Sequence, residues 1–272
     1  MKHAHNLTRG RREQVCRMGI RKNDIPILEY DTNPGAVIMP DHEELGLNLP
    51  RKAVLAFLGK EIDRYALAND APVISRFVSI TKSYPVYLLK FQGEDICLVQ
   101  APAGASAAVQ VLDWLIAYGA REIISTGSCG VLEDWAENVF LVPAKALRDE
   151  GTSYHYAAPS RYMEVSAKAR AGIKKAPETH CIPYREVMTW STDGFFRETK
   201  EKVAYRKQEG CAVVDMECAA LAACAALRGA VWGELLYTAD SLANVEQYDK
   251  RGWGFDSMAY ALQLCLESVW NL

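Results

Sequence analysis

Short segments that are apolar along their whole length alternate with longer apolar segments of helical spacing through most of this sequence. REIIST (121–126) and VWGELLYTAD (231–240) have the length and composition of buried strands. GASAAVQVLDWLIAYGA (104–120) has the pattern of an apolar helix, and GCAVVDMECAALAACAALRGA (210–230) begins as a strand and continues as a helix. Strands buried on both faces need helices on both sides. The sequence therefore predicts a three-layer α/β fold with a mixed, largely buried central sheet.

Five further segments complete this prediction. GAVIMP (35–40) is a short apolar run closed by proline, which predicts a buried strand, and RKAVLAFLGKEIDRYALAN (51–69) has helical spacing. PVYLLKFQGEDICLVQAP (85–102) predicts two strands around a Gln-Gly turn, and NVFLVPAKAL (138–147) predicts another strand. The last stretch, 253–272, predicts a closing helix.

The length and charge of the chain limit the classes of protein to which it can belong. Its 272 residues, of which 50% are hydrophobic, suffice for one large core, so we expect a single domain over 19–272 behind a polar arm at 1–18. A net charge of −3 gives no basic excess for binding nucleic acid. No apolar run reaches the roughly 18 residues of a membrane span. The basic start of the chain lacks the apolar core of a secretory signal.

The cysteines predict neither a metal site nor disulfides. All eight are scattered, mostly in apolar surroundings, with no CxxC or Cys/His ligand spacing. Free thiols in a large core indicate a reducing compartment, and we therefore expect a cytoplasmic protein. The sequence indicates no organic cofactor.

Polar residues at the ends of the predicted strands form one group of candidates, because ligands of α/β folds bind beyond the carboxyl ends of strands. They are Ser125–Ser128, Asp215–Glu217 and Asp240. Within TGSCG, Ser128 could be a nucleophile, a turn residue or a ligand-binding hydroxyl. A nucleophile elbow needs a helix at once after the serine, whereas a turn and a strand are predicted here. We favour a cradle for an anion or a ribose, formed by the amides of Gly127 and Ser128 and by the serine hydroxyl.

Four motifs occur in a fixed order: IISTGSCGVL, STDGFFRE, VVDMECAAL and YTADSL. Together with GIRKNDI (19–25) and LRDEGTSYHY (147–156), they resemble the nucleoside phosphorylase family, in the branch that holds hexameric purine nucleoside phosphorylase and uridine phosphorylase. The related nucleosidases share that fold. The resemblance extends from about residue 17 to the C-terminus, and TGSCG combined with DMECAAL is its most specific part.

The resemblance implies a role for each matched residue. Glu217 would bind the ribose hydroxyls, Met216 would pack on the sugar, and Phe195 and Gly130 would contact the base. Asp240 would protonate N7 of the leaving base as a general acid. Cleaving an N-glycosidic bond builds positive charge on the ribose, which a carboxylate stabilises.

The choice of base depends on two positions after Phe195. Uridine phosphorylases recognise uracil with a Gln and an Arg there, and this chain has Thr199 and Glu201 instead. The base is therefore expected to be a purine.

The implied phosphate site departs from the family. If 35–40 is the first strand, the Gly-Asp-Pro loop and Arg that follow it in phosphorylases become Asp41, Glu43 and Leu45. A second family Arg becomes Ser125, and a third, lent by the neighbouring subunit, becomes Lys82. Phosphate recognition favours paired Arg side chains and open amides. The residues that remain for an anion are Gly127, Ser128, Lys82 and Ser125.

Three functions follow from this departure. The first is phosphorolysis of a purine nucleoside in purine salvage, with inorganic phosphate as co-substrate, if Lys82, Arg148 or Arg161 rebuild the anion site. The second is hydrolysis of a nucleoside, methylthioadenosine or AMP, with Glu44 activating water, because DHEEL resembles the acidic run of the hydrolytic relatives. The third is a nucleoside-binding protein without catalysis, since the phosphate arginines are missing.

The resemblance also implies an assembly. The family forms dimers, or trimers of dimers, whose active sites are shared between subunits. Arg17 would then reach the 5′-end of the sugar in the neighbouring subunit, where its charge would favour an anionic 5′-substituent; the alternative is a solvated residue of the basic arm.

Overall fold

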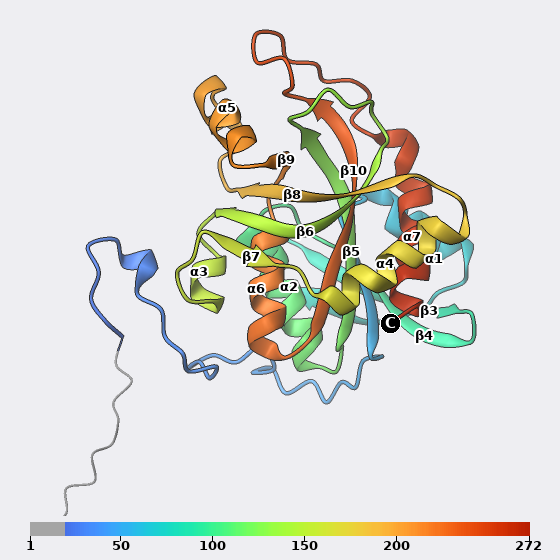
Figure 1. The fold of residues 1–272 in the computed structure, drawn as a ribbon. Coiled ribbons are helices and arrows are strands. Elements are labelled where there is room, and N and C mark those ends of the chain that lie inside the picture. The colour runs from blue at the N-terminus through green and yellow to red at the C-terminus, as the bar shows by residue number, and fades with distance from the viewer. Residues whose placement is uncertain (1–19) are drawn as a thin grey trace, which may run out of the picture.

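The computed structural model describes residues 20–272, which form a ten-stranded mixed sheet with helices on both faces (Figure 1). The strands are β1 (Lys52–Ala56), β2 (Val73–Val78), β3 (Ser83–Phe91), β4 (Glu94–Gln100), β5 (Glu122–Val131), β6 (Phe140–Asp149), β7 (Tyr162–Glu164), β8 (Tyr184–Thr192), β9 (Cys211–Asp215) and β10 (Val231–Ser241). Their order is β10-β6-β8-β9-β5-β1-β4-β3-β2, with β7 on β6. Because β10 also pairs with β5, the first five strands of this order close into a ring.

The helices form two layers. They are α1 (Lys60–Ala68), α2 (Ala105–Ala117), α3 (Ser153–Tyr156), α4 (Ala167–Thr179), α5 (Lys200–Gln208), α6 (Cys218–Arg228) and α7 (Met258–Trp270), with 3-10 turns η1 (Pro26–Leu28), η2 (Phe195–Arg197) and η3 (Phe255–Ser257). One core cluster joins α2 and α6 to the sheet, and a second joins α1, α4 and α7 to its other face. The predicted three-layer fold with a mixed, buried sheet is confirmed.

Burial explains why the apolar segments adopt these elements. Eight consecutive residues of α6, from Cys218 to Ala225, are buried, so this helix needs no polar face. It ends at Gly229, which has a left-handed φ of 68°. Strand β10 is buried over almost its whole length because helices cover it and β5 and β6 pair with it. Local pattern and tertiary position agree in these segments.

Two sequence predictions near the start of the fold were wrong. Residues 35–40 form no strand, and Val37 and Ile38 are exposed. Residues 51–69 are not one helix: β1 comes first, and α1 begins after Gly59, whose φ is 56°. Apolar runs of this length fit either element by periodicity. Pairing of β1 with β4 and β5 decides for the strand.

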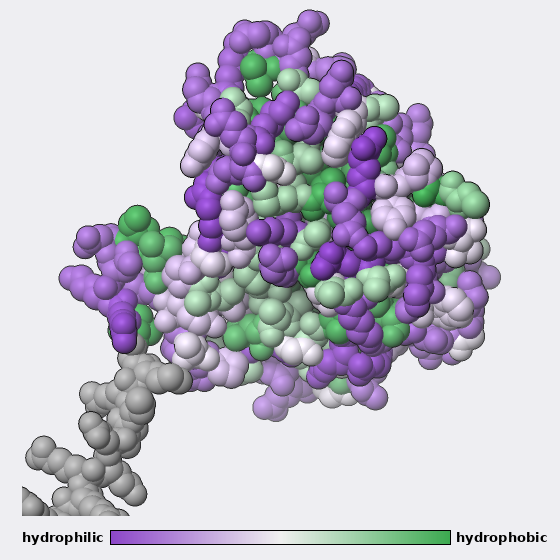
Figure 2. Space-filling view, in the orientation of Figure 1, coloured by the Kyte–Doolittle hydropathy of each residue, from purple (hydrophilic) through white to green (hydrophobic). Residues whose placement is uncertain are grey.

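This correction moves the end of the first strand. The segment that reaches the sheet edge is Phe57–Lys60, directly after β1, and DHEEL lies in an exposed turn outside the sheet. Apolar surface also remains on the first described residues, at the left of Figure 2, beside α3. None of the helices in residues 20–272 has the length and apolar character that crossing a membrane requires.

Candidate active site

A cavity of about 250 Å³ opens at the carboxyl ends of β5, β9 and β10. It is lined by Phe57, Ala103, Gly127, Ser128, Cys129, Gly130, Phe195, Glu198, Val214, Asp215, Met216, Glu217, Glu234, Leu236, Asp240 and Trp253. The structure thus brings together the strand-end candidates from three distant motifs. A second hollow adjoins it on the outer side and shares Phe195, Glu198, Asp240 and Trp253 with it.

Strand β5 contributes the glycines and the serine of TGSCG. A Cβ on Gly127 would lie 3.1 Å from Cβ of Phe57, and one on Gly130 would lie 2.9 Å from side-chain carbons of Val214 and Leu242. Both glycines therefore allow neighbouring chains to approach closely. Ser128 lies inside β5 instead of at a strand-to-helix elbow. Its hydroxyl faces the cavity and makes no hydrogen bond to a residue in the described part of the chain.

We expect Ser128→Ala to weaken nucleoside binding without abolishing turnover. Losing one neutral hydrogen bond costs about 1 kcal/mol, which corresponds to roughly a fivefold rise in KM. Steady-state kinetics on a purine nucleoside would measure it. Complete loss of turnover, together with a covalent adduct on Ser128 of the wild type, would contradict the ligand-binding role.

Asp215 holds the turn that leads from β9 into α6. Its Oδ1 accepts hydrogen bonds from the hydroxyls of Thr189 (2.9 Å) and Ser191 (2.8 Å). Its Oδ2 accepts them from the backbone amides of Glu217 (2.9 Å) and Cys218 (2.6 Å), which are otherwise unpaired at the start of the helix. Burial raises the pKa of Asp215, and these four donors oppose that rise. Asp215 thereby positions Glu217.

Glu217 is a buried carboxyl directed into the cavity. One of its oxygens accepts a hydrogen bond from the amide of Gly104 at 2.5 Å. Burial, with the nearby charge of Asp215, raises the pKa of Glu217 to about 8. The carboxyl lines the cavity, so it can also accept hydrogen bonds from hydroxyl groups of a ligand.

Asp240 and Glu198 form a pair of carboxyls at the outer end of the cavity. Asp240 is 6% exposed, and burial raises its pKa, against the hydrogen bond from Tyr248 and the charge of Arg251. Burial, followed by repulsion from Asp240, raises the pKa of Glu198 to about 7. The Glu198 carboxyl can therefore carry a proton near neutral pH, and the raised pKa of Asp240 shifts that residue in the same direction, toward the protonated form that a general acid needs.

Aromatic and thioether side chains supply the apolar walls of the cavity. Phe195 lies at its mouth, 42% exposed, with its ring edge-on to Phe196 at a centroid distance of 4.9 Å. Trp253, on the loop after β10, lines both the cavity and the outer hollow. Met216 is half-buried on the inner wall. Flat rings and a soft thioether suit a base and a sugar face.

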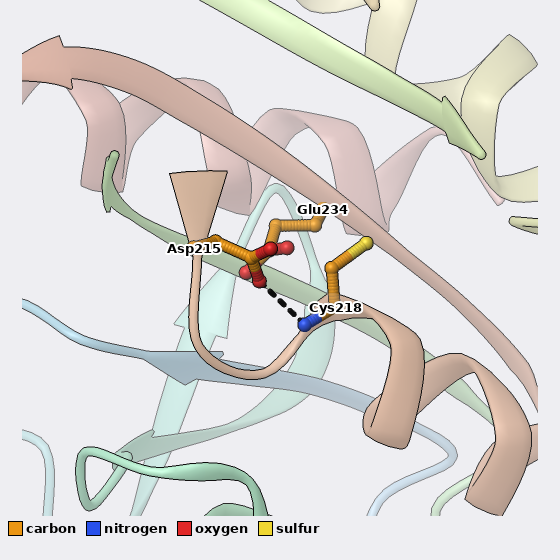
Figure 3. Close-up of side chains that lie close together, drawn as sticks. All are labelled: Asp215, Cys218 and Glu234. Atoms are coloured by element: carbon orange, nitrogen blue, oxygen red, sulfur yellow. Dashed lines mark hydrogen bonds between the residues drawn. The ribbon is translucent and has the colours of Figure 1, made fainter. Parts of the chain in front are cut away.

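Glu234 lies on β10 next to Asp215 and Cys218 (Figure 3). One donor atom from each of the three lies within 4.8 Å of the others, which is a spacing that a metal ion could use. The four hydrogen bonds to Asp215, however, already occupy its oxygens. The trio therefore suits a hydrogen-bonded network better than a metal ion.

Several predicted site residues lie outside this cavity. Glu44 is exposed in the turn 41–44, and the assignment of DHEEL to the end of the first strand was wrong because that strand is β1. Ser125 is fully buried and accepts a hydrogen bond from the Trp232 indole at 3.0 Å. Lys82 lies on an exposed surface beside Tyr84. Arg17 falls outside the described residues.

The other cations and base-reading positions considered from the sequence are also engaged elsewhere. Arg148 is buried and donates to the hydroxyls of Ser153 and Ser160 and to two backbone carbonyls. Arg161 pairs with Glu209. Thr199 caps α5 by accepting from the Lys202 amide, and neither it nor Glu201 lines the cavity.

Four cavity residues with aromatic or carboxyl side chains were missed from the sequence: Phe57, Glu198, Glu234 and Trp253. Glu234 had a usable signal, since it is a lone charge inside the apolar run VWGELLYT, where an unpaired carboxylate is costly. Glu217 carries the same signal within VVDMECAAL. The other three carried no local signal, because their place in the cavity depends on loops that return from distant elements.

Comparison with known proteins supports this assignment of the fold. A family model, described as the phosphorylase superfamily, matches residues 51–265. Guanosine phosphorylase of Halorubrum lacusprofundi is 24% identical over 175 residues, which are 62% of this chain and 69% of that protein.

Two solved structures share the fold. AMP nucleosidase from Bacteroides thetaiotaomicron superimposes with a TM-score of 0.67 at 19% identity, covering 81% of this chain and 87% of its own. Uridine phosphorylase from Vibrio fischeri superimposes with a TM-score of 0.70 at 21% identity, covering 83% and 95%. The fold thus accommodates both phosphorylases and a nucleosidase. With the family model spanning most of its length, the chain belongs to the phosphorylase superfamily, a group of glycosyl-cleaving enzymes.

Proposed function

We propose that this protein hydrolyses the N-glycosidic bond of a purine nucleoside, with water as the nucleophile. One observation carries the choice of water over phosphate. Among the described residues, the cavity is lined by five carboxyl side chains and by no Lys, Arg or His. Phosphorolysis was the first of the three functions considered from the sequence, and the composition of the cavity favours the second, hydrolysis.

Electrostatics explain why such a cavity disfavours phosphate. Each lining carboxyl that is ionised would repel a phosphate charge 4 Å away by about 4 kcal/mol at the effective dielectric of a protein site, and a protonated one would still offer no positive charge. A phosphate dianion would meet several carboxyls without a paired guanidinium. The Gly-Asp-Pro loop that the resemblance calls for is replaced after β1 by Phe57, Leu58 and Gly59, and Phe57 closes over Gly127. Water carries no charge and fits the same space.

The remaining cavity residues can perform the reaction. Glu217 would hold the ribose hydroxyls and stabilise the positive charge that develops on the sugar. Phe195 would stack on the base, and Asp240 would give a proton to N7 so that the base leaves as a neutral molecule. Positions 199 and 201 offer no uracil-reading pair, which supports a purine.

Base release from adenosine, inosine, guanosine, uridine, methylthioadenosine and AMP tests the proposal. We expect free ribose (or the corresponding 5-substituted sugar) from purine substrates at a rate that added phosphate does not change, and no release from uridine. Ribose 1-phosphate formed only when phosphate is present would overturn hydrolysis. Nucleoside binding without any release would favour a non-catalytic binding protein.

Phosphorolysis stays a second candidate because of one exposed group of cations. Lys82 shares a surface hollow with Lys60 and Arg76, and a neighbouring subunit could receive such a group. The likeness to a guanosine phosphorylase favours the same reaction. Lys82→Ala separates the two candidates: it would raise the KM for phosphate in a phosphorylase and leave a hydrolase unchanged.

A further inference from the structure

We propose that Glu234 is a catalytic residue whose carboxylate takes the proton from the attacking water. This role for Glu234 depends on the hydrolysis proposed above. Glu234 lines the cavity although it is only 1% exposed, and its Oε2 has no hydrogen-bond partner within the described chain. A buried polar atom without a hydrogen-bond partner costs free energy. We therefore expect an atom of the bound ligand or water to form the missing hydrogen bond.

The place of Glu234 is the nucleophile end of the cavity. A carboxylate oxygen of Glu234 lies within 4.8 Å of a carboxylate oxygen of Asp215, which accepts a hydrogen bond from the amide of Glu217, the residue proposed to hold the ribose. The opposite end is marked by Asp240 and Phe195, which also line the outer hollow, whereas Glu234 does not. If the base lies between Asp240 and Phe195, the face of the sugar opposite the base is directed toward Glu234.

The surroundings of Glu234 favour proton uptake. The groups that face it are Asp215 and Glu217 on the β9–α6 turn, Cys218 on α6, Cys129 on β5 and Cys265 on α7. Burial raises the pKa of each of these three thiols well above the usual value, which keeps them neutral. Burial and the two acids likewise raise the pKa of Glu234. The ionised form is the one that acts as the base, so this step should become faster as the pH rises, and the ionised carboxylate takes up a proton more readily than an ordinary one. None of these neighbours is a cation that would weaken the carboxylate as a base.

The step balances without another reactant. The water oxygen bonds to C1′ of the ribose while the C1′–N bond breaks. The electron pair of the C1′–N bond passes to the base. Asp240 gives its proton to N7 of the base, and Glu234 receives a proton from the water. The products are ribose and free base. The carboxyls return to their starting states by exchanging protons with solvent.

Glu234→Gln tests this role directly. The amide keeps the size of the side chain but does not act as a base, so we expect kcat to fall by about 10²–10⁴ while KM changes only a few-fold. Glu150→Gln is the matched control: Glu150 is also buried, at 5% exposure, with an unpartnered oxygen, and it lies outside the cavity. We expect the control to keep its rate.

Rescue of base release by azide is a second measurement. We expect no rescue if Glu234 has only a structural role. The azide anion attacks without losing a proton, so it should restore base release by Glu234→Ala at least tenfold and yield ribosyl azide. A folded Gln variant with the wild-type kcat, or a folded Ala variant that azide does not restore, would overturn the role. If either result is found and the wild type still releases free ribose, the role of Glu234 is wrong but hydrolysis is not. If the wild type forms ribose 1-phosphate only with phosphate, both proposals are wrong.

Discussion

Asparagine in place of Asp240 should lower kcat on purine nucleosides by about 10²–10⁴, the usual contribution of general acid catalysis. The carboxyl lies at the base end of the cavity, beside Glu198, and burial raises its pKa. An acid must be protonated to act. The wild-type rate should therefore fall as the pH rises through that raised pKa, and the Asn variant should lose this alkaline limb. A pH profile of kcat would measure both effects.

The leaving group provides the sharpest check of that role. A nucleoside with N7 already methylated carries a cationic base and needs no proton, so the Asn variant should cleave 7-methylguanosine at nearly the wild-type rate. Asp249→Asn is a matched control on the loop that follows β10, because Asp249 has a side chain 63% exposed and lies outside the cavity. An Asn variant equally impaired on both substrates would contradict the general acid role.

Glutamine in place of Glu217 should lower kcat/KM by about 10²–10⁴. Two hydrogen bonds from sugar hydroxyls to a charged acceptor are together worth roughly 3–6 kcal/mol. The pKa of Glu217 in the wild type is raised to about 8, and its ionised form stabilises the positive charge that develops on the ribose. Ionisation of Glu217 should therefore contribute an acid limb to the pH profile of kcat/KM, opposed by the alkaline limb of Asp240, and only the acid limb should vanish in the Gln variant.

Substrates that lack a hydroxyl separate ribose binding from a general loss of structure. The penalty of Glu217→Gln should be clearly smaller for 2′-deoxynucleosides than for ribonucleosides, since one of the two hydrogen bonds is absent from the start. Steady-state kinetics on matched pairs of substrates would measure the difference. An equal penalty on both sugars would show that Glu217 acts through the fold and not through the ribose.

Local pattern was sufficient where burial is uniform along an element. The apolar runs that became α2, α6, β5 and β10 were assigned from the sequence because each is covered on nearly all sides in the fold. Local pattern gave the wrong element for 35–40 and for 51–69, because a short apolar run fits a strand, a helix or an exposed segment equally well. Hydrogen-bonding partners that lie far along the chain settle such cases.

The same division holds for the candidate site. The rule that ligands bind at strand ends grouped Gly127, Ser128, Glu217 and Asp240 correctly as neighbours, and the structure lines one cavity with them. The rule could not place Glu44 or Ser125. Their positions depend on which strand comes first in the sheet and on which face of β5 a side chain lies.

The sequence by itself determined the class of fold, the family and the motifs that meet at the sheet edge, because these depend on apolar periodicity and on short contiguous stretches. The tertiary structure alone decided the charge of the cavity. Pairing of β1 between β4 and β5 brings Phe57 to the cavity instead of an acidic or phosphate-binding loop, and pairing of β10 with β5 adds Glu234. Such pairings join residues far apart in the chain, so no local pattern encodes them.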